Sequence, residues 1–285
     1  MMPNALRPYA RILRLAALAA AALAIAALLP PGSSGAETFV APQDACSQAV
    51  DARQNRYQHC EVRGFEFAPP APGLRVDGGL NGGVSVAGDE RANVRVEAQV
   101  QTWAKTAAEA KQVADAVEIH LPERGGAVSA EGPEQRQGQG WAVSYRVFVP
   151  KSADLDLKTH NGGVSIHDVT GRLRFDVVNG GVDLRRTAGD VQGHTVNGGL
   201  SIELAGARWS GKGLDARTTN GGVQVRVPGD YNAEFKAETV NGNLRFDLPN
   251  ATQGNMKGRL TTTLGAGGPP IHVATTNGGV RVAAR

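Results

Sequence analysis

Apolar and polar residues alternate through most of the chain beyond residue 69, and the triplet Asn-Gly-Gly interrupts this alternation repeatedly. Counted from each Asn, the residues six and four positions earlier and three and five positions later are mostly apolar, whereas those between are mostly polar or charged. A period of two is typical of strands that bury one face. The six triplets and one Asn-Gly-Asn variant begin at Asn81, Asn161, Asn179, Asn197, Asn220, Asn277 and Asn241.

The spacing of these triplets predicts a repeat architecture. From Asn161 onward the intervals are 18, 18, 23, 21 and 36 residues, and the last equals two intervals of 18, with Gly258-Arg259-Leu260 near its midpoint. Asn and Gly suit a corner because they tolerate positive φ, and Gly also lets two backbones approach closely. The alternation keeps its parity across each triplet, so the chain is predicted to turn there with its apolar face still inside.

Two all-β architectures fit this pattern. In a β-solenoid, or β-helix-like repeat, each repeat is one coil of short strands, and the Asn side chains form a ladder along the axis. In an antiparallel β-meander or sandwich, each Asn-Gly would be a tight hairpin turn. We favour the solenoid because near-identical corners are what stacked coils produce, whereas successive hairpins need no such identity.

The repeat is interrupted between Asn81 and Asn161. A capping box from Thr106 to Glu109 followed by apolar residues at helical spacing predicts one α-helix near 107–118. Alternating residues on both sides of it, with a Gly- and Gln-rich loop before the second set, predict a strand-helix-loop-strand insertion at about 90–150. The β-repeat domain as a whole is predicted to span 69–285.

The first coil departs from the later ones. Leu74 and Val76 fall one residue out of phase with the equivalent residues of the other coils. This shift predicts a bulge or a capping coil at the start of the repeat.

Residues 1–36 are predicted to be a secretory signal peptide. Three arginines precede an apolar run of 15 residues, and small residues end the segment. As a helix the run would measure about 22 Å, less than the roughly 30 Å of a membrane's hydrocarbon core, so a stable membrane span is not expected. The mature protein is predicted to be exported, to the periplasm or to the cell surface and exterior.

Removing this segment also changes the charge. The chain has 30 Lys and Arg and 27 Asp and Glu, and the three basic residues of 1–36 would leave with it, so 27 of each sign remain. A formally neutral protein without a basic patch is not expected to bind nucleic acid.

The two cysteines, Cys46 and Cys60, are predicted to form a disulfide in an N-terminal segment at 37–68. Export to an oxidising compartment makes their pairing the default. A bridge closing a loop of about 15 residues is worth roughly 3 kcal/mol in the chain-entropy model.

The order of these features resembles a known family. A strand with Asn-Gly-Gly-Val-Ser-Val, a strand with an Ala-rich helix, a strand ending at Val149-Pro150 and serial Thr-x-Asn-Gly-Gly-Val turns resemble the putative-adhesin family of exported bacterial envelope proteins, over about residues 60–285. The resemblance implies an elongated all-β repeat at the cell envelope, with adhesion or envelope-stress roles, and it supplies no catalytic residues. The chain departs from the family pattern at Asn243, which replaces the second Gly of one corner.

Candidate chemistry is sparse, and no cofactor, metal or catalytic residue is predicted. The six histidines lack the close spacing of metal ligands: they are His59, His120, His160, His167, His194 and His272. Seven acids on the predicted outer face are scattered over different columns among Lys and Arg: they are Asp156, Asp176, Asp183, Glu203, Asp215, Glu238 and Asp247.

We therefore predict an exported, non-enzymatic, adhesin-like scaffold that binds another envelope component or a polysaccharide. Self-association through the terminal coils is a further expectation, because Val280-Arg281-Val282 would present an open strand edge. The alternative is a glycan-active lyase or hydrolase with a groove where the insertion meets the coils. Glu123 and Glu131 would be its acids.

Overall fold

The structure, a computed structural model, describes residues 37–39, 46, 50–51, 56–122, 125–248 and 254–285. The predicted signal peptide and Glu123 lie outside these residues. The described residues belong to one compact unit. Its described part consists of two large β-sheets, a small hairpin sheet and one α-helix.

Sheet A has 13 strands, most of them from the second half of each coil. In spatial order they are β1 (Glu37–Phe39), β3 (Arg56–Phe67), β6 (Val94–Ala104), β9 (Gly140–Pro150), β5 (Val84–Asp89), β11 (Val164–His167), β13 (Val182–Arg185), β15 (Leu200–Glu203), β17 (Val223–Val227), β23 (Val280–Ala284), β19 (Leu244–Asp247) and β20 (Gly254–Met256), with β2 (Val50–Asp51) also paired to β3.

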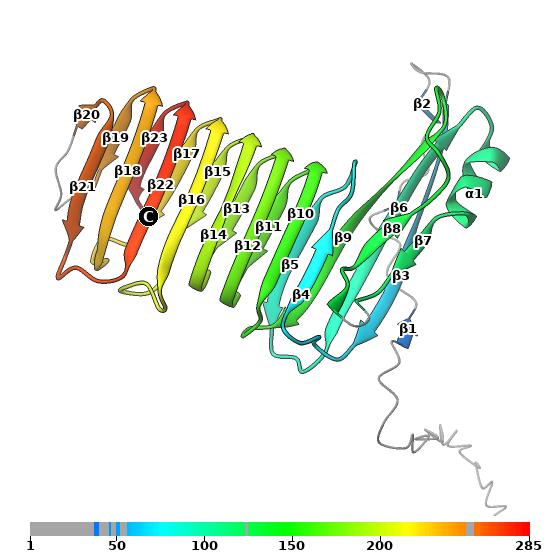
Figure 1. Cartoon of the computed structure of the whole chain (residues 1–285), viewed down its shortest axis with the longest axis horizontal. Helices are drawn as coiled ribbons and strands as arrows, with labels where there is room; N and C mark the ends of the chain where they lie inside the picture. The colour runs from blue at the N-terminus through cyan, green and yellow to red at the C-terminus, as the bar shows by residue number, and fades with distance from the viewer. Residues whose placement is uncertain (1–36, 40–45, 47–49, 52–55, 123–124, 249–253) are drawn as a thin grey trace, which may run out of the picture. The chain divides into compact units, whose positions relative to one another are not determined.

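Sheet B has 8 strands, most of them from the first half of each coil. In spatial order they are β21 (Arg259–Leu264), β18 (Ala233–Asn241), β22 (Pro270–Asn277), β16 (Gly213–Asn220), β14 (Ala188–Asn197), β12 (Thr170–Asn179), β10 (Leu155–Asn161) and β4 (Leu74–Asp77). Figure 1 shows β10, β12, β14, β16 and β22 lying side by side in this order.

Parallel pairing between successive coils confirms the solenoid-like repeat and excludes the meander. β12 pairs in parallel with β10 and β14, and β13 pairs in parallel with β11 and β15. Each Asn-Gly-Gly corner therefore carries the chain from sheet B to sheet A, as the strands flanking Asn179 show. Hairpin turns would have joined antiparallel neighbours within one sheet.

The core lies between the two sheets and consists of the alternating apolar residues. Leu173 and Leu214 of sheet B and Ile166, Leu184 and Ile202 of sheet A are each at most 2% exposed. Phe235 and Phe246 meet edge to face, with ring centroids 5.4 Å apart. Because the aromatic fraction of the chain is only 5%, branched aliphatic residues supply most of this packing.

The last coil of the sequence is not the last coil of the stack. β22 lies between β16 and β18, and β23 lies between β17 and β19. The 36-residue interval is therefore not a missing coil: β20 and β21 pair antiparallel with β19 and β18 instead. The expected open edge at Val280-Arg281-Val282 is wrong, because β23 has a partner strand on both sides.

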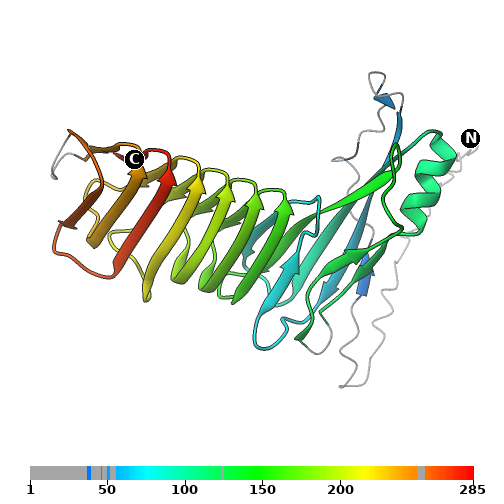
Figure 2. The same ribbon diagram turned by 45° about the horizontal axis from the view of Figure 1, so that its top comes forward.

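The insertion forms the other end of the unit. α1 (Ala107–Asp115) begins at the predicted capping box on Thr106, and the strands before and after it, β6 and β9, pair antiparallel. Both views show α1 beside β3 and β6 (Figure 2). The loop predicted after the helix contains a strand, β8 (Ser129–Glu131), which pairs with β7 (Glu118–His120).

Arg63 of β3 fixes the end of this helix. Its guanidinium donates to the carbonyl oxygens of Ala114 and Val117 at 2.7 and 2.5 Å, and also pairs with Glu61. A cation at a helix C-terminus both satisfies free carbonyl groups and complements the helix dipole. This contact ties α1 to sheet A.

The one-residue phase shift of the first coil is absorbed in a bulge, as predicted. Leu74 pairs with Leu155 and Asn81 pairs with Asn161, so β4 and its corner hold one residue more than the next coil. The extra residue falls in the stretch that contains Gly79, whose φ is +65°. Glycine adopts this left-handed conformation without the steric cost of a side chain.

Candidate functional site

The seven corner Asn residues form one continuous row of side-chain hydrogen bonds. There are six such bonds of 2.7–3.0 Å, and in each the Nδ2 of one Asn donates to the Oδ1 of the Asn before it in the spatial order Asn81, Asn161, Asn179, Asn197, Asn220, Asn277 and Asn241. Asn81 is half-buried and the other six are exposed. The row therefore lies on the surface, and it holds the corners in register without needing burial.

The first glycine of each triplet allows the coils to stack. A Cβ on Gly180 would lie 2.0 Å from the carbonyl oxygen of Gly162, whereas a Cβ on Gly181 would lie 3.5 Å from the nearest backbone oxygen. Neither glycine has positive φ. The reason for glycine at the first position is therefore the close approach of neighbouring backbones and not a left-handed conformation.

A buried Thr column stands two residues before the Asn row. The hydroxyl groups of Thr195, Thr218 and Thr275 each donate to the carbonyl oxygen of the first corner glycine in a neighbouring coil, at 2.7–2.8 Å. Thr218 is 4% exposed. Threonine suits this column because it fills a β-branched core position and satisfies a carbonyl group that has no strand partner.

We expect Thr218→Val to lower the free energy of unfolding by about 1–3 kcal/mol, because it keeps the shape but leaves the Gly198 carbonyl without its donor. The neighbouring Thr219 is exposed on the same strand, so Thr219→Val is the matched control and should change stability by less than about 0.5 kcal/mol. Urea unfolding of both variants measures this difference. Equal losses would contradict the role given to the column.

The outer face of sheet B is charged but internally paired. Arg217 binds Asp215 through two hydrogen bonds of 2.8 Å, and Arg174 pairs with Asp190. His272 lies between Asp215 and Glu238, at 3.4 and 3.3 Å. A depression of about 800 Å³ on this face is lined by Arg174, Asp215, Arg217 and Glu238, among others. Most of its charges are therefore already neutralised by a neighbour.

Glu238 has three cationic neighbours, and this environment predicts a dependence of stability on pH. Lys236, followed by His272 and Arg259, lowers the pKa of Glu238 to about 2. Because the folded-state pKa lies below the ordinary value of 4.5, ionised Glu238 stabilises the fold above pH 4.5, and this contribution is lost as the pH falls towards 2.

We expect Glu238→Gln to lower stability at pH 7 by about 1 kcal/mol, a figure reduced for solvent screening of a partly exposed pair. The variant should also lose less stability than the original protein between pH 4.5 and 2. Thermal unfolding across this pH range is the measurement. Parallel curves for the two proteins would contradict the pairing of Glu238.

The outer face of sheet A contains a groove of about 520 Å³ where β6 and β9 meet β5, β11 and β13. Its floor is made of small residues. Glu97, Gln99, Arg146 and Asp183 stand around it, and the floor residues are Gly83, Gly163, Gly181, Ser85, Ser144 and Ser165. Val62, Val84, Tyr145 and Val164 also line the groove, so its hydroxyl and charged side chains lie among apolar ones.

The acidic groups of this groove are held by arginines. Glu97 is 6% exposed and pairs with Arg95 at 2.7 Å and Arg146 at 3.4 Å. Asp183 pairs through Oδ2 with Arg185 and His167, while its buried Oδ1 has no hydrogen-bond partner among the described residues. Asp183 thus places a carboxylate with one unpartnered oxygen at the lining of the groove.

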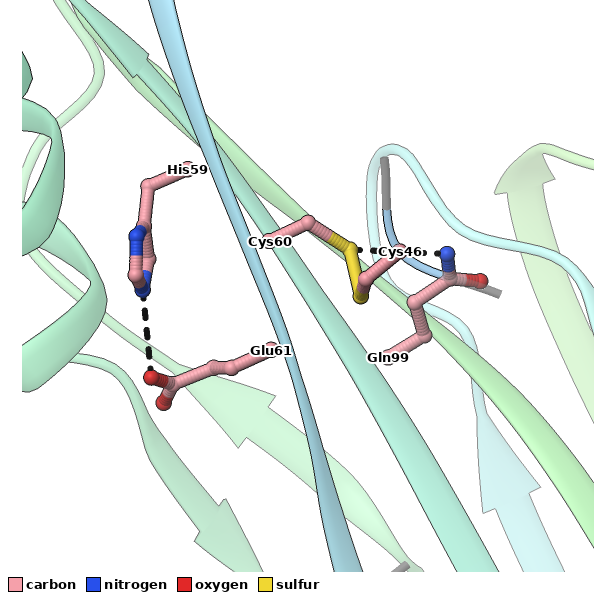
Figure 3. The surroundings of a disulfide bond; sticks show 5 residues. All are labelled: Cys46, His59, Cys60, Glu61 and Gln99. Carbon is pink, nitrogen blue, oxygen red and sulfur yellow. Dashed lines mark hydrogen bonds and ion pairs between the residues drawn. A yellow bond between two sulfur atoms is a disulfide. The ribbon is translucent and has the colours of Figure 1, made fainter. Parts of the chain in front are cut away.

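The Cys46–Cys60 disulfide lies beside this groove. The two Cα atoms are 5.3 Å apart, and Gln99, which lines the groove, donates to Sγ of Cys60 at 3.6 Å. Figure 3 shows His59 and Glu61 on the opposite side of β3. The predicted bridge is therefore present, and it joins Cys46 to the strand at the rim of the groove.

The groove occupies the place expected for the alternative enzyme, but the acids named for that enzyme do not line it. Glu131 is 81% exposed on β8 and pairs with His120, and Glu123 lies outside the described residues. Sequence reasoning missed Glu97 and Arg146, which sit in the insertion. The only signal that could have indicated them is the alternation along their strands, which places both side chains on the outer face of the sheet.

The histidines are dispersed over the described surface. His167, His194 and His272 each pair with a carboxylate of a neighbouring strand, and His59 pairs with Glu61. Within the part of the chain that the structure describes, no three His, Cys, Asp or Glu side chains are grouped so as to hold a metal ion. No helix among those residues is long and apolar enough to cross a bilayer.

Residues 150–283 match the model of the family described as Toastrack DUF4097. This match confirms the predicted resemblance for the coils from β10 onward. No curated protein matches the chain by sequence.

Two solved structures are similar to it. One is described as a putative cell adhesion protein from Clostridium sporogenes, with 11% identity, a TM-score of 0.45, and coverage of 81% of this chain and 100% of the other. The second is described as a putative adhesin from Bacteroides fragilis, with 9% identity, a TM-score of 0.30, and coverage of 80% and 97%.

Proposed function

We propose that this chain, which carries a Toastrack DUF4097 domain at residues 150–283, is an exported, non-enzymatic protein of the cell envelope that binds another envelope component along the outer face of sheet A. The carrying observation is the groove at the junction of the insertion and the coils, open to solvent and lined by hydroxyl, amide and charged side chains among apolar ones. Polar groups converging on one concave site are the usual mark of a binding site.

The pairing of charges supports binding rather than catalysis. A glycosidase needs two carboxylates on either side of one bond, one of them free to exchange a proton. In the groove, both oxygens of Glu97 contact arginines, and Asp183 is held by Arg185 and His167. These contacts hold each carboxylate in place beside cationic side chains, an arrangement that suits recognition of a ligand.

The test is retention of purified envelope fractions by the immobilised protein. Peptidoglycan, lipopolysaccharide and a detergent extract of envelopes would each be passed over the original chain and over Ser165→Tyr, which places a bulky ring in the groove floor. We expect retention of at least one fraction by the original chain and loss of that retention by the variant. Thr219→Tyr, at an exposed position of sheet B outside the groove, is the control.

Failure of every fraction to bind would overturn the proposal. Equal retention by the two tyrosine variants would place the binding surface elsewhere and would contradict the assignment to the groove. Thermal unfolding of each variant checks that the fold is intact.

A further inference from the structure

The groove is one end of a longer row of side chains that crosses sheet A from strand to strand. We call it the transverse row and define it as Glu97, Arg146, Ser85, Ser165, Asp183, Ser201, Gln224, Arg281 and Arg245. Each member is the direct register partner of the next. Since neighbouring strands lie about 4.8 Å apart, Ser85 and Arg281 are separated by five spacings, or roughly 24 Å.

The chemistry of the transverse row changes along its length. In the groove, Ser165 donates to Ser85 at 2.9 Å, so this pair can still donate one hydrogen bond and accept others. Next to it, Asp183 has an unpartnered oxygen. Two serine hydroxyl groups beside a carboxylate match the hydroxyl groups of a carbohydrate, which can donate to the carboxylate and either donate to or accept from serine.

The other end of the row carries surplus positive charge. Arg281 and Arg245 are register partners on adjacent strands and share the single carboxylate of Asp247, at 3.8 and 2.8 Å. Arg226, exposed on β17, has no carboxylate within ion-pair distance among the described residues. Guanidinium groups that lack a carboxylate of their own can bind the carboxylate or phosphate groups of a ligand through paired hydrogen bonds.

We infer that the transverse row binds a linear, hydroxyl-rich polymer that carries anionic groups, with its sugar hydroxyls in the groove and its anionic groups on Arg281 and Arg245. The inference rests on the proposed function and names its ligand class. A glycan fits better than an acidic peptide, because the row crosses the face of sheet A between strands that are already paired on both sides, so it offers no strand edge for a peptide to join.

The order of the strands is part of this inference. Arg281 comes from the last coil of the sequence, and it reaches the row only because β23 lies between β17 and β19. If β19 paired directly with β17, the row would pass from Gln224 to Arg245, and Arg281 would not lie beside Arg245. The position of β23 between β17 and β19 therefore places Arg281 next to Arg245.

The experiment is a binding titration of the full chain with oligogalacturonate, which carries carboxylates, and with poly(glycerol phosphate), which carries phosphates. We expect one or both to bind, with affinity falling as salt rises. The double variant Arg245→Gln/Arg281→Gln should weaken binding at least tenfold, roughly the effect of losing one charge-assisted hydrogen bond. Arg217→Gln on sheet B is the matched control and should bind as the original chain does.

Asp183→Asn adds a second readout, at the groove end. It replaces a carboxylate by an amide of the same shape, so it should weaken binding of both polymers while leaving the salt dependence set by Arg281 and Arg245 unchanged. If the double variant and Arg217→Gln bind equally well, the arginine pair is not the site and the inference is overturned.

Two further probes decide the ligand class. Neutral dextran should bind at least tenfold more weakly than the anionic polymers, and poly-glutamate should too, because it lacks the hydroxyl groups. Equal binding of poly-glutamate would overturn the carbohydrate assignment. If neither anionic polymer binds but an envelope fraction is still retained, the inference fails and the proposed function stands; if nothing is retained, both fail.

Discussion

Gly180→Ala is expected to lower the free energy of unfolding by about 3 kcal/mol or more, because its Cβ would lie 2.0 Å from the carbonyl oxygen of Gly162 in the preceding coil. The obstructing atoms are backbone atoms of a stacked coil, so no side chain can rotate away. Neighbouring corners are linked through the Asn row and the strand ladders, so the coil can move only by breaking these contacts.

The control for this variant lies one residue away. A Cβ on Gly181 would make an ordinary contact at 3.5 Å, so Gly181→Ala should change stability by less than about 1 kcal/mol and can raise it by restricting the unfolded chain. Urea unfolding of both variants measures the two effects. Similar losses would show that both glycines are needed for their backbone conformation, in contradiction to the close-approach account.

Phe235→Ala is expected to cost about 3–5 kcal/mol. Phe235 is fully buried on β18 and meets Phe246 of sheet A edge to face, so truncation leaves a cavity between the two sheets and removes an aromatic pair. Calorimetric or urea unfolding gives the loss directly.

Val240, on the same strand, is 74% exposed and provides the control. Val240→Ala removes apolar atoms that are already in water, so it should change stability by less than about 0.5 kcal/mol. A small effect of Phe235→Ala would mean that the two sheets are not packed on each other at this coil.

The repeat itself could be predicted from the sequence because its signals are local. Strand alternation, the position of each corner and the capping box at Thr106 depend on residues close together in the chain, and each is found in the structure. The one-residue shift at Leu74 was also visible, since it breaks a column that the other coils keep.

The order of the coils could not be predicted, because the coils are alike where they touch. Asn241 and Asn277 each present the same amide to a neighbour, so the pattern is equally compatible with either one next to Asn220. Residues 254–264 decide the order. They form strands β20 and β21, which pair antiparallel with the free edges of β19 and β18, so the last coil enters on the other side of these strands, next to β16 and β17.

The candidate site could not be predicted from the sequence, for a related reason. The alternation places Ser165 on the solvent face of the repeat, but the position of Arg146 beside Ser85 depends on the register between β9 and β5. These strands are joined through the whole insertion. Register across such a connection is set by packing that alternation alone does not specify.

The position of β23 between β17 and β19 can be tested directly, and the proposed arginine pair depends on it. Register partners on adjacent strands have Cα atoms about 5 Å apart, and this distance permits a disulfide. When another strand lies between the two, the Cα atoms are nearly 10 Å apart, and a disulfide cannot form. The test is disulfide formation under mild oxidation in three double-cysteine variants, read by gel shift. The account predicts bridges in Gln224→Cys/Arg281→Cys and in Arg281→Cys/Arg245→Cys and none in Gln224→Cys/Arg245→Cys. A bridge between positions 224 and 245, with position 281 joined to neither, would contradict it.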